Sequence, residues 1–569
     1  MSDWNLCIVL LFILGVNILL FLTRPTPGIL PLDIFHDHIW NAGNTVSLVS
    51  NFPLQSMNIE TKPYIGYHIL IHILGAHISL ITGLTPHLVG LQFIFVPLVP
   101  LLIFNMVSLL NQFLKHEGIY LFYALAVLLF GGGFSIVHEV KVNSYLTSST
   151  NFLGVILLFS VMTLMMHSHR VKSAGRLVLV FLGLFLSTAA KGSIGTALLM
   201  GTILWIFFRI WKKTITLGDY VDCTGAILGF ALSYFVFFGL PSSAQPIATD
   251  FIKKSSFLLV PLSYVTENYL TRPFIDVIYK YSPGQLQLLF HVILTIFVLP
   301  VYILLFFSYR LIAIYNLKTH GINKKNQRII FVAIGSLLVA YMVNMGPQSN
   351  AYFVNSALYI LDVLFVVYLQ KENVFSLLQK FWQKKHIYAA IGLIFIMILP
   401  FLSMGGWNRR EYAYNFFMYG KIGQSMDAKF AKTEYRQTRQ SITPEIYDAL
   451  KYIRQNTPNE VVVVTPFIDL KSGKPLAFYT SAFAERTVFF EGYGFGGIQK
   501  YIGHSQINKR IETTKKIYHK YDIPEEMKNN RYVFLVNTET KNELEKKYDS
   551  NILYENHKWC VLQIRMNNS

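Results

Sequence analysis

The chain has 569 residues, of which 53% are hydrophobic and only 14% are charged. Apolar runs of about 18 residues or more recur along it, which predicts a polytopic α-helical membrane protein rather than a soluble one. The net charge of +18 would suit a nucleic-acid partner. Much of the basic excess in residues 1–404, however, lies in short loops between apolar runs, where it acts as a topology signal. No nucleic-acid partner is therefore expected.

The apolar runs predict eleven membrane-spanning helices. The first run, from Leu6 to Leu22, has no basic segment before it and no clear cleavage site, so we interpret it as an uncleaved anchor. The three cysteines form no metal-type pair and offer no disulfide within the tail. The predicted spans cover approximately residues 5–22, 88–112, 118–137, 151–167, 177–190, 193–210, 221–240, 285–308, 329–346, 353–370 and 388–404.

The distribution of Lys and Arg predicts the orientation of these spans. If the N-terminus is cytoplasmic, the short inner loops carry 16 basic residues, whereas the longer outer segments of the same region carry 8. Inner loops of membrane proteins are enriched in Lys and Arg. We therefore predict a multi-pass protein of the cell membrane with a cytoplasmic N-terminus and an extracytoplasmic C-terminal domain.

The first outer loop, residues 23–87, carries the most informative polar cluster. Residues 1–404 contain only 13 Asp and Glu, and two of these, Asp33 and Asp37, stand four residues apart beside His36 and His38. A carboxylate and an imidazole at a bilayer surface suit proton transfer or metal-assisted chemistry. Asp37 is the better candidate base, because histidines flank it and an apparent helix follows it. The alternative is a helix N-cap or a solvated acid.

A second part of this loop, from Ile65 to Leu84, is long enough to span the membrane. Counting it as a span would reverse the loop charges that follow. His68, His72 and Ser79 fall on one helical stripe, so we predict an amphipathic helix on the outer membrane surface, with a bilayer-embedded helix as the alternative. The i,i+4 spacing of the two histidines would also allow a transition metal to bind on one helix face.

Two further positions are candidates for polar chemistry. His138 and Glu139 end the third predicted helix on the same side as Asp37, where they could complete a divalent-metal site with the first loop. Ordinary interfacial charges are the alternative. Asp362 lies mid-depth in the tenth predicted span. Intramembrane acids usually face the helix bundle, so Asp362 is either catalytic support or the structural partner of a buried polar group.

The tail predicts a separate α/β domain. The chain divides into a transmembrane domain, residues 1–404, and an extracytoplasmic domain, residues 405–569, long enough for a core of its own. Residues 492–497 formally match the dinucleotide-binding pattern GxGxxG, but we reject it, because the segment lies outside the cell without a clear βαβ unit. The elements predicted in the tail are a helix at 445–455, strands at 460–465, 487–490 and 532–536, and a hairpin at 553–564.

The loop and the spans together resemble the GT-C superfamily of membrane glycosyltransferases, of the protein O-mannosyltransferase and aminoarabinose transferase type. The resemblance rests on Asp37 in His36-Asp37-His38-Ile39-Trp40-Asn41, on the proline and aromatic residues of segment 62–70, and on the turn Ala189-Ala190-Lys191-Gly192. It implies transfer of a sugar from a polyprenyl-phosphate carrier to an acceptor in the cell envelope. The chain departs from the pattern at His38, where several such families carry an acid.

A polyprenyl-phosphate sugar keeps its lipid in the bilayer and its phosphate at the interface, so the enzyme needs a cation at that depth. Lys191, near the outer face, could neutralise the leaving phosphate; the alternative is a lysine that snorkels to the interface. Lys253 and Arg272 in the outer segment 241–284 are other candidates for the phosphate, although each alone suits a surface charge. A divalent metal ion is a candidate cofactor.

In this reading Asp37 takes the proton of the acceptor hydroxyl, and displacement assisted by a single base would invert the anomeric centre. A transporter or lipid flippase is the rival prediction, with Asp362 and Lys191 as coupling or substrate charges. The spans, however, show no paired halves with matching broken helices. A non-catalytic protein of the cell envelope is the third possibility.

Overall fold

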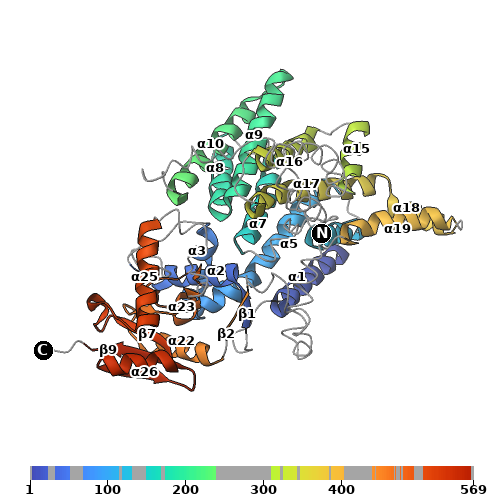
Figure 1. The fold of residues 1–569 in the computed structure, drawn as a ribbon. Helices are drawn as coiled ribbons and strands as arrows, with labels where there is room; N and C mark the ends of the chain where they lie inside the picture. The colour runs from blue at the N-terminus through green and yellow to red at the C-terminus, as the bar shows by residue number, and fades with distance from the viewer. Residues whose placement is uncertain are drawn as a thin grey trace, which may run out of the picture. The chain divides into compact units, whose positions relative to one another are not determined.

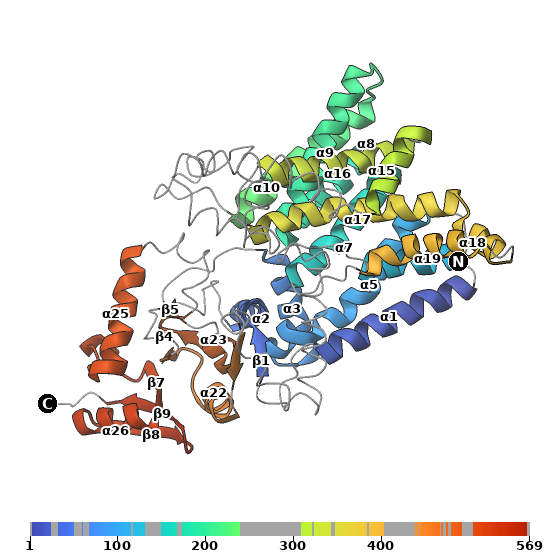
Figure 2. The same cartoon turned by 45° about the vertical axis from the view of Figure 1, so that its right-hand side comes forward.

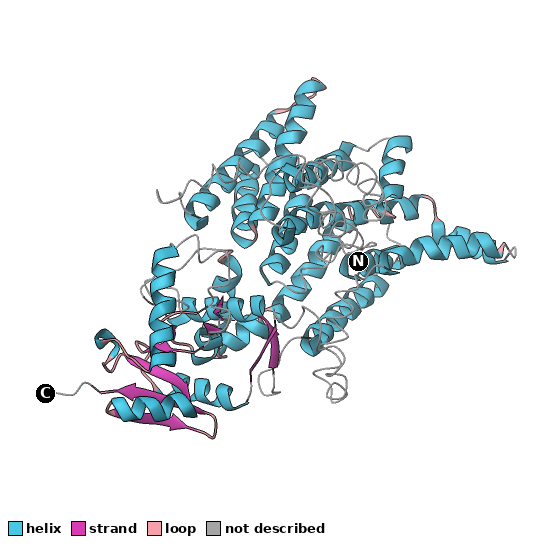
Figure 3. Ribbon diagram, in the orientation of Figure 1, coloured by secondary structure: helices cyan, strands magenta, loops and turns pink. Residues whose placement is uncertain are grey.

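The computed structural model describes residues 3–23, 32–50, 60, 68–114, 118–130, 149–167, 173–238, 309–320, 324–342, 347–383, 386–402, 439–442, 444–466, 468–469, 474–475, 479–491 and 504–565. The chain folds into two compact units (Figure 1). One, here called the helical unit, comprises Met1–Ile18 and Leu98–Tyr414; the other, the mixed unit, comprises Leu19–Pro97 and Asn415–Ser569. All the described strands belong to the mixed unit (Figure 3).

The helical unit is built from long apolar helices, as the hydropathy pattern predicts. Its described helices, including those that continue into the mixed unit, are α1 (Asp3–Thr23), α5 (Phe95–Leu110), α6 (Gly118–Phe130), α7 (Ser149–His167), α8 (Ser173–Ala190), α9 (Gly192–Trp211), α10 (Leu217–Phe238), α15 (Arg310–His320), α16 (Lys324–Met342), α17 (Pro347–Lys371), α18 (Val374–Gln383) and α19 (Ile387–Leu402). Figure 2 shows them as a bundle.

Six helices of the described residues are long and apolar enough to cross a bilayer. This finding confirms the polytopic helical class, whereas the count of eleven stays a prediction, since the span predicted at 285–308 lies outside the described residues. The six are Pro86–Leu110, Ser149–Met166, Ser173–Ala190, Gly192–Trp211, Leu217–Phe237 and Tyr352–Lys371.

Glycines allow two helix pairs of this unit to approach closely. A Cβ placed on Gly335 of α16 would lie 2.6 Å from the backbone nitrogen of Gly201 in α9, and one on Gly225 of α10 would lie 3.0 Å from the carbonyl oxygen of Leu177 in α8. Small residues at such crossings increase the van der Waals contact between membrane helices. This contact matters because the hydrophobic effect does not drive helices together within lipid.

Arginines of the predicted inner loops are bound to acids at the ends of these helices. Arg176 donates from Nε to Oδ1 of Asp222 at 2.6 Å, and Arg328 also pairs with Asp222. Arg209 pairs with Asp219 at 3.4 Å. Some of the basic residues that signal topology in the sequence therefore also connect α8, α9, α10 and α16 in the folded unit.

The tail residues of the mixed unit surround a five-stranded sheet of order β6-β3-β7-β9-β8. The pairs β6–β3 and β3–β7 are parallel, and the pairs β7–β9 and β9–β8 are antiparallel. The elements are β2 (Arg439–Ile442), α22 (Pro444–Asn456), β3 (Val462–Val464), β4 (Ile468–Asp469), β5 (Lys474–Pro475), α23 (Tyr479–Ala484), β6 (Thr487–Val488), α25 (His504–Lys520), the 3-10 helix η5 (Glu525–Met527), β7 (Tyr532–Asn537), α26 (Thr538–Lys547), β8 (Ser550–Glu555) and β9 (Trp559–Ile564).

The first loop belongs to this same unit. It supplies β1 (Leu32–Phe35), α2 (His36–Ser50), α3 (Leu70–Thr82), α4 (Pro86–Leu88) and the π-helix η1 (Val89–Phe93). Strand β1 pairs antiparallel with β2 of the tail. Ile39 and Ala42 of α2 lie in one hydrophobic core with Ala449 and Phe483 of the tail. The predicted domain limits, 1–404 and 405–569, stay a prediction; the contacts group residues 19–97 with the tail.

Because the first loop and the tail share a sheet and a core, they must lie on the same side of the membrane. The chain between them therefore crosses the bilayer an even number of times. The ten spans predicted between the loop and the tail meet this condition.

Candidate functional site

The candidate base lies at the start of α2. Asp37 is the second residue of that helix, between His36 and His38. The exposed N–H groups and the dipole of a helix N-terminus favour an anionic side chain in the first turn. Asp33 lies instead on β1, opposite Ser441. The two carboxylate residues therefore lie on different elements, because α2 begins only at His36.

Helix α2 is packed on several sides. Besides the core residues Ile39 and Ala42, Trp40 contacts the ring of His72 edge-on, with 6.3 Å between ring centroids. Thr45 meets two glycines: a Cβ on Gly75 of α3 would lie 3.0 Å from its Cγ2, and a Cβ on Gly90 of η1 would lie 3.0 Å from its Oγ1. Helices α2 and α23 also contact each other. The backbone that carries Asp37 is thus fixed by the first loop and the tail together.

Helix α3 is short and turns its polar stripe inward. Its 13 residues extend about 20 Å at 1.5 Å each, less than the roughly 30 Å of a hydrocarbon core. His72 and Ser79 are buried, whereas Leu80 and Ile81 are 67% and 84% exposed. This distribution favours the surface helix over the embedded one, with the apolar side facing lipid.

The helical pair of histidines expected for a metal is not formed. His68 precedes α3, whose N-cap is Ile69, and has a left-handed backbone with φ +52°. The regular i,i+4 relation of His68 to His72 therefore does not hold. Among the described residues no group of three or more His, Cys, Asp or Glu side chains could hold a metal ion.

Polar side-chain contacts also join the first loop to the tail. His87 Nδ1 lies 2.8 Å from Oε1 of Glu485, and the Arg454 guanidinium lies within 3.3 Å of the same imidazole nitrogen. Glu60, the one described residue of segment 51–67, accepts a hydrogen bond from the Tyr532 hydroxyl at 2.8 Å. Sequence reasoning missed these contacts, because they join positions about 400 or more residues apart.

In the helical unit, Lys191 occupies the break between α8 and α9 and is only 3% exposed. Its ammonium lies 3.6 Å from the centre of the Tyr352 ring and 3.4 Å from Oγ1 of Thr150. Gly154 leaves room for its stem, since a Cβ there would come within 2.8 Å of the Lys191 Cβ. The side chain therefore packs inside the unit rather than reaching along its surface.

Lys191 and the two residues that contact its ammonium belong to three different helices. Thr150 begins α7, Tyr352 lies in the second turn of α17, and Lys191 caps α9. The sequence-based topology predicts all three positions at the outer face. The ring face and the hydroxyl both contact the buried ammonium, and a cation is attracted to the face of an aromatic ring.

Asp362 is buried in an ion pair with Arg310. Its Oδ1 accepts hydrogen bonds from the Tyr309 hydroxyl and from Arg310 Nε, both at 2.6 Å, and its Oδ2 accepts from Arg310 NH2 at 3.0 Å. Both side chains of the pair are at most 2% exposed. Of the two predicted roles, this geometry favours the structural partner of a buried polar group.

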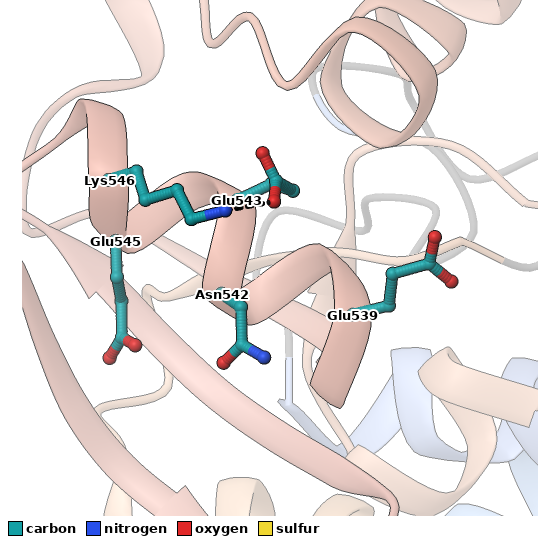
Figure 4. Close-up of a pocket in the computed structure, with 5 residues that line it drawn as sticks. All are labelled: Glu539, Asn542, Glu543, Glu545 and Lys546. Carbon is teal, nitrogen blue, oxygen red and sulfur yellow. Dashed lines mark hydrogen bonds and ion pairs between the residues drawn. The ribbon is translucent and has the colours of Figure 1, made fainter.

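The remaining candidates lie outside the described residues: His138, Glu139, Lys253 and Arg272. The rejected glycine-rich pattern at 492–497 lies outside them too. In the part of the chain that is described, α26 borders an open depression of about 500 Å³. Figure 4 shows the residues that line it. They are Glu539, Asn542, Glu543, Glu545 and Lys546. All five belong to one helix, so we assign it no role.

No family model and no curated protein matches the sequence. Solved structures do resemble the fold. The apo oligosaccharyltransferase of Archaeoglobus fulgidus matches with a TM-score of 0.53 and 13% identity, over 97% of this chain and 73% of that chain. ArnT from Cupriavidus metallidurans bound to undecaprenyl phosphate matches with a TM-score of 0.47 and 10% identity, over 97% of both chains.

The A. fulgidus oligosaccharyltransferase in complex with Zn and sulfate matches with a TM-score of 0.47 and 13% identity, over 93% of this chain and 68% of that chain. The match to the apo oligosaccharyltransferase, with its TM-score of 0.53, covers 97% of this chain. The resemblance seen in the sequence is thus confirmed at the level of the fold: the chain has a fold similar to that of this polytopic oligosaccharyltransferase.

Proposed function

We propose that the protein is a glycosyltransferase that moves a sugar from a polyprenyl-phosphate carrier to an acceptor in the cell envelope, at the outer face of the membrane. The observation that carries the proposal is the buried ammonium of Lys191, held between Thr150 and Tyr352 at a helix break. The fold similarity to an oligosaccharyltransferase supports the same reaction class. The cytoplasmic N-terminus and the extracytoplasmic mixed unit are part of this proposal.

On the donor side, the lipid tail stays in the bilayer while the phosphate meets Lys191. As the bond from the sugar to the phosphate breaks, negative charge develops on the leaving oxygen. A cation already desolvated and held in place stabilises that charge without reorganisation. Lys253 and Arg272 are further candidates for the same phosphate.

On the acceptor side, Asp37 removes the proton from the attacking hydroxyl. Attack on the face opposite the leaving phosphate, assisted by one base, inverts the anomeric centre. Asp33 is the second carboxylate of the loop, and His36 and His38 flank the base. A divalent metal ion near Glu139 and His138 remains a candidate cofactor, and His38 stands where an acidic ligand would otherwise be found.

The rival function, a transporter or flippase, needs a mobile charge within the bundle. The carboxylate of Asp362 accepts three hydrogen bonds from Arg310 and Tyr309, and breaking such a buried pair costs about 3–5 kcal/mol. This pairing favours a fixed structural role and disfavours the transporter. A non-catalytic envelope protein would show no turnover in the experiment below.

The test compares two carboxylate variants, Asp37→Asn and Asp33→Asn, as purified protein. Release of undecaprenyl phosphate from undecaprenyl-phosphate hexoses is measured with a cell-envelope extract as the acceptor. Loss of a general base predicts a fall of about 10²–10⁴-fold for Asp37→Asn and a much smaller effect for Asp33→Asn. Full activity of a folded Asp37→Asn protein, or the larger loss in Asp33→Asn, would remove Asp37 from the role of base.

A further inference from the structure

Helix α2 carries buried polar side chains whose hydrogen-bonding capacity is not used. Asn41 and Asn44 are 3% and 6% exposed, and Oδ1 of Asn41 and Nδ2 of Asn44 have no hydrogen-bond partner. His72 of α3 is 1% exposed, and its Nε2 also has none. Leaving such a group unpaired costs about 1–3 kcal/mol each, so three neighbouring cases call for a missing partner.

These groups face the space between α2 and α3. Trp40 and Thr45 mark two sides of the α2 surface that meets α3, because Trp40 contacts His72 and Thr45 meets Gly75. At 100° per residue they are about 140° apart around the helix axis. Positions 41 and 44 fall inside this arc, as does position 37, one turn toward the N-terminus. The unpaired atoms of Asn41 and Asn44 therefore belong to the helix face that also includes position 37.

The unpaired atoms also define the chemistry of the missing partner. An amide oxygen needs a donor, an amide nitrogen needs an acceptor, and an imidazole nitrogen takes either role according to its tautomer. All three side chains are uncharged in these roles, which disfavours a phosphate. Hydroxyl groups both donate and accept, and a sugar presents several of them at fixed spacing. A buried water molecule has the same capacity and is the alternative partner.

We propose that Asn41, Asn44 and His72 form a subsite that binds hydroxyl groups of the donor sugar beside Asp37. This inference rests on the proposed function and assigns the recognition of the sugar to α2 and α3. Binding the hydroxyl groups here holds the sugar at the start of α2, where position 37 lies. The three residues are positioning and specificity residues rather than participants in proton transfer.

The experiment measures two affinities for each protein: for bare undecaprenyl phosphate and for undecaprenyl-phosphate hexoses that carry glucose, galactose, mannose or N-acetylglucosamine. For the wild-type protein, at least one hexose lipid should bind about 10-fold or more tightly than the bare lipid. In Asn44→Ala this preference should fall to about one, while the affinity for the bare lipid stays unchanged. One lost hydrogen bond to a hydroxyl corresponds to about this factor.

Ser47→Ala is the matched control, because Ser47 is equally buried on the same helix and its hydroxyl donates to the carbonyl of Gly43 at 3.0 Å. It should keep the preference. A wild-type protein that binds bare and sugar-bearing lipids equally overturns the subsite. So does an Asn44→Ala protein that only changes in thermal stability, which is the result expected for a buried water. Failure of the wild-type protein to bind any of these lipids would instead contradict the proposed function itself.

Discussion

Two buried polar clusters of this chain differ in how completely their hydrogen bonds are made. Around Asp362 in the helical unit, both carboxylate oxygens are bound by Arg310 and Tyr309. Around α2 in the mixed unit, Asn41, Asn44 and His72 keep unpaired atoms. In the first cluster both oxygens of the carboxylate are bound, and only Nη1 of Arg310 has no hydrogen-bond partner. The two asparagines of the second cluster share a helix face with position 37.

The largest effect is expected when the ion pair between Arg310 and Asp362 is broken. Replacing Arg310 with Met leaves the Asp362 carboxylate buried without its cation, which should destabilise the protein by about 3–5 kcal/mol. The double variant Arg310→Met/Asp362→Leu removes both charges and should recover most of that loss. Thermal unfolding in detergent measures both. A transporter that uses Asp362 would instead lose function in the double variant while the stability recovers.

A second prediction concerns the charge at Glu491, which binds the first turn of α23, a neighbour of α2. Its oxygens accept from the backbone N–H groups of Thr480 and Ser481 at 3.1 and 2.9 Å. Burial raises the pKa of this carboxyl from 4.5 to about 7, although the hydrogen bonds from Thr480 and Ser481 act to lower it. The folded state thus binds the proton more tightly than the unfolded state does.

Because this pKa is raised on folding, the stabilisation from protonated Glu491 is full below pH 4.5 and is lost as the pH rises toward 7. The free energy of unfolding should therefore fall by up to about 3 kcal/mol over that range. Glu491→Gln should flatten the dependence. Equal slopes for the two proteins between pH 4.5 and 8 would show that Glu491 is not the group responsible.

The third prediction separates a functional lysine from a structural one. Lys191→Met should lower the affinity for bare undecaprenyl phosphate about 30-fold, since a hydrogen bond to a charged group contributes about 2 kcal/mol. Lys212 is a matched control, because its ammonium also lies over an aromatic ring, that of Trp211 at 4.5 Å, but the residue is exposed. Lys212→Met should bind normally. Equal affinities for all three proteins would make Lys191 a packing residue.

The smallest effect is expected at the hydrogen bond between Tyr532 of the tail and Glu60 of the first loop. Tyr532→Phe removes the hydroxyl that donates to Glu60 and should cost about 1 kcal/mol, because Arg531 still pairs with that carboxylate at 2.9 Å. Thermal unfolding measures the change. A loss above about 3 kcal/mol would contradict this account, in which Arg531 keeps the Glu60 carboxylate paired.

The polytopic helical class and the positions of many helices were predictable from the sequence, because apolar runs and loop charge are local signals. The helix break at Lys191 and the strands near 462 and 532 were predicted for the same reason. The pairing of β1 with β2 was not, since residues 32–35 and 439–442 are brought together only through the intervening membrane spans. The short helices α18 and α23 were also missed.

Within the candidate site, the acid at the start of α2 was visible as a rare carboxylate in an apolar chain. The roles of Asn41 and Asn44 were hidden, although they stand four and seven residues after Asp37 on one helical stripe. Their lack of partners depends on how α3 packs against α2, which no local pattern encodes. The burial of Lys191 likewise depends on three helices distant in sequence, so its alternative, a snorkelling lysine, could not be dismissed beforehand.

The central claim is that the protein consumes a polyprenyl-phosphate sugar. The most direct measurement is the pool of such lipids in cells that lack the protein, analysed by mass spectrometry. One polyprenyl-phosphate sugar should accumulate, return to its normal level with the wild-type chain, and stay high with Asp37→Asn. An unchanged lipid pool, or full correction by Asp37→Asn, would contradict the account.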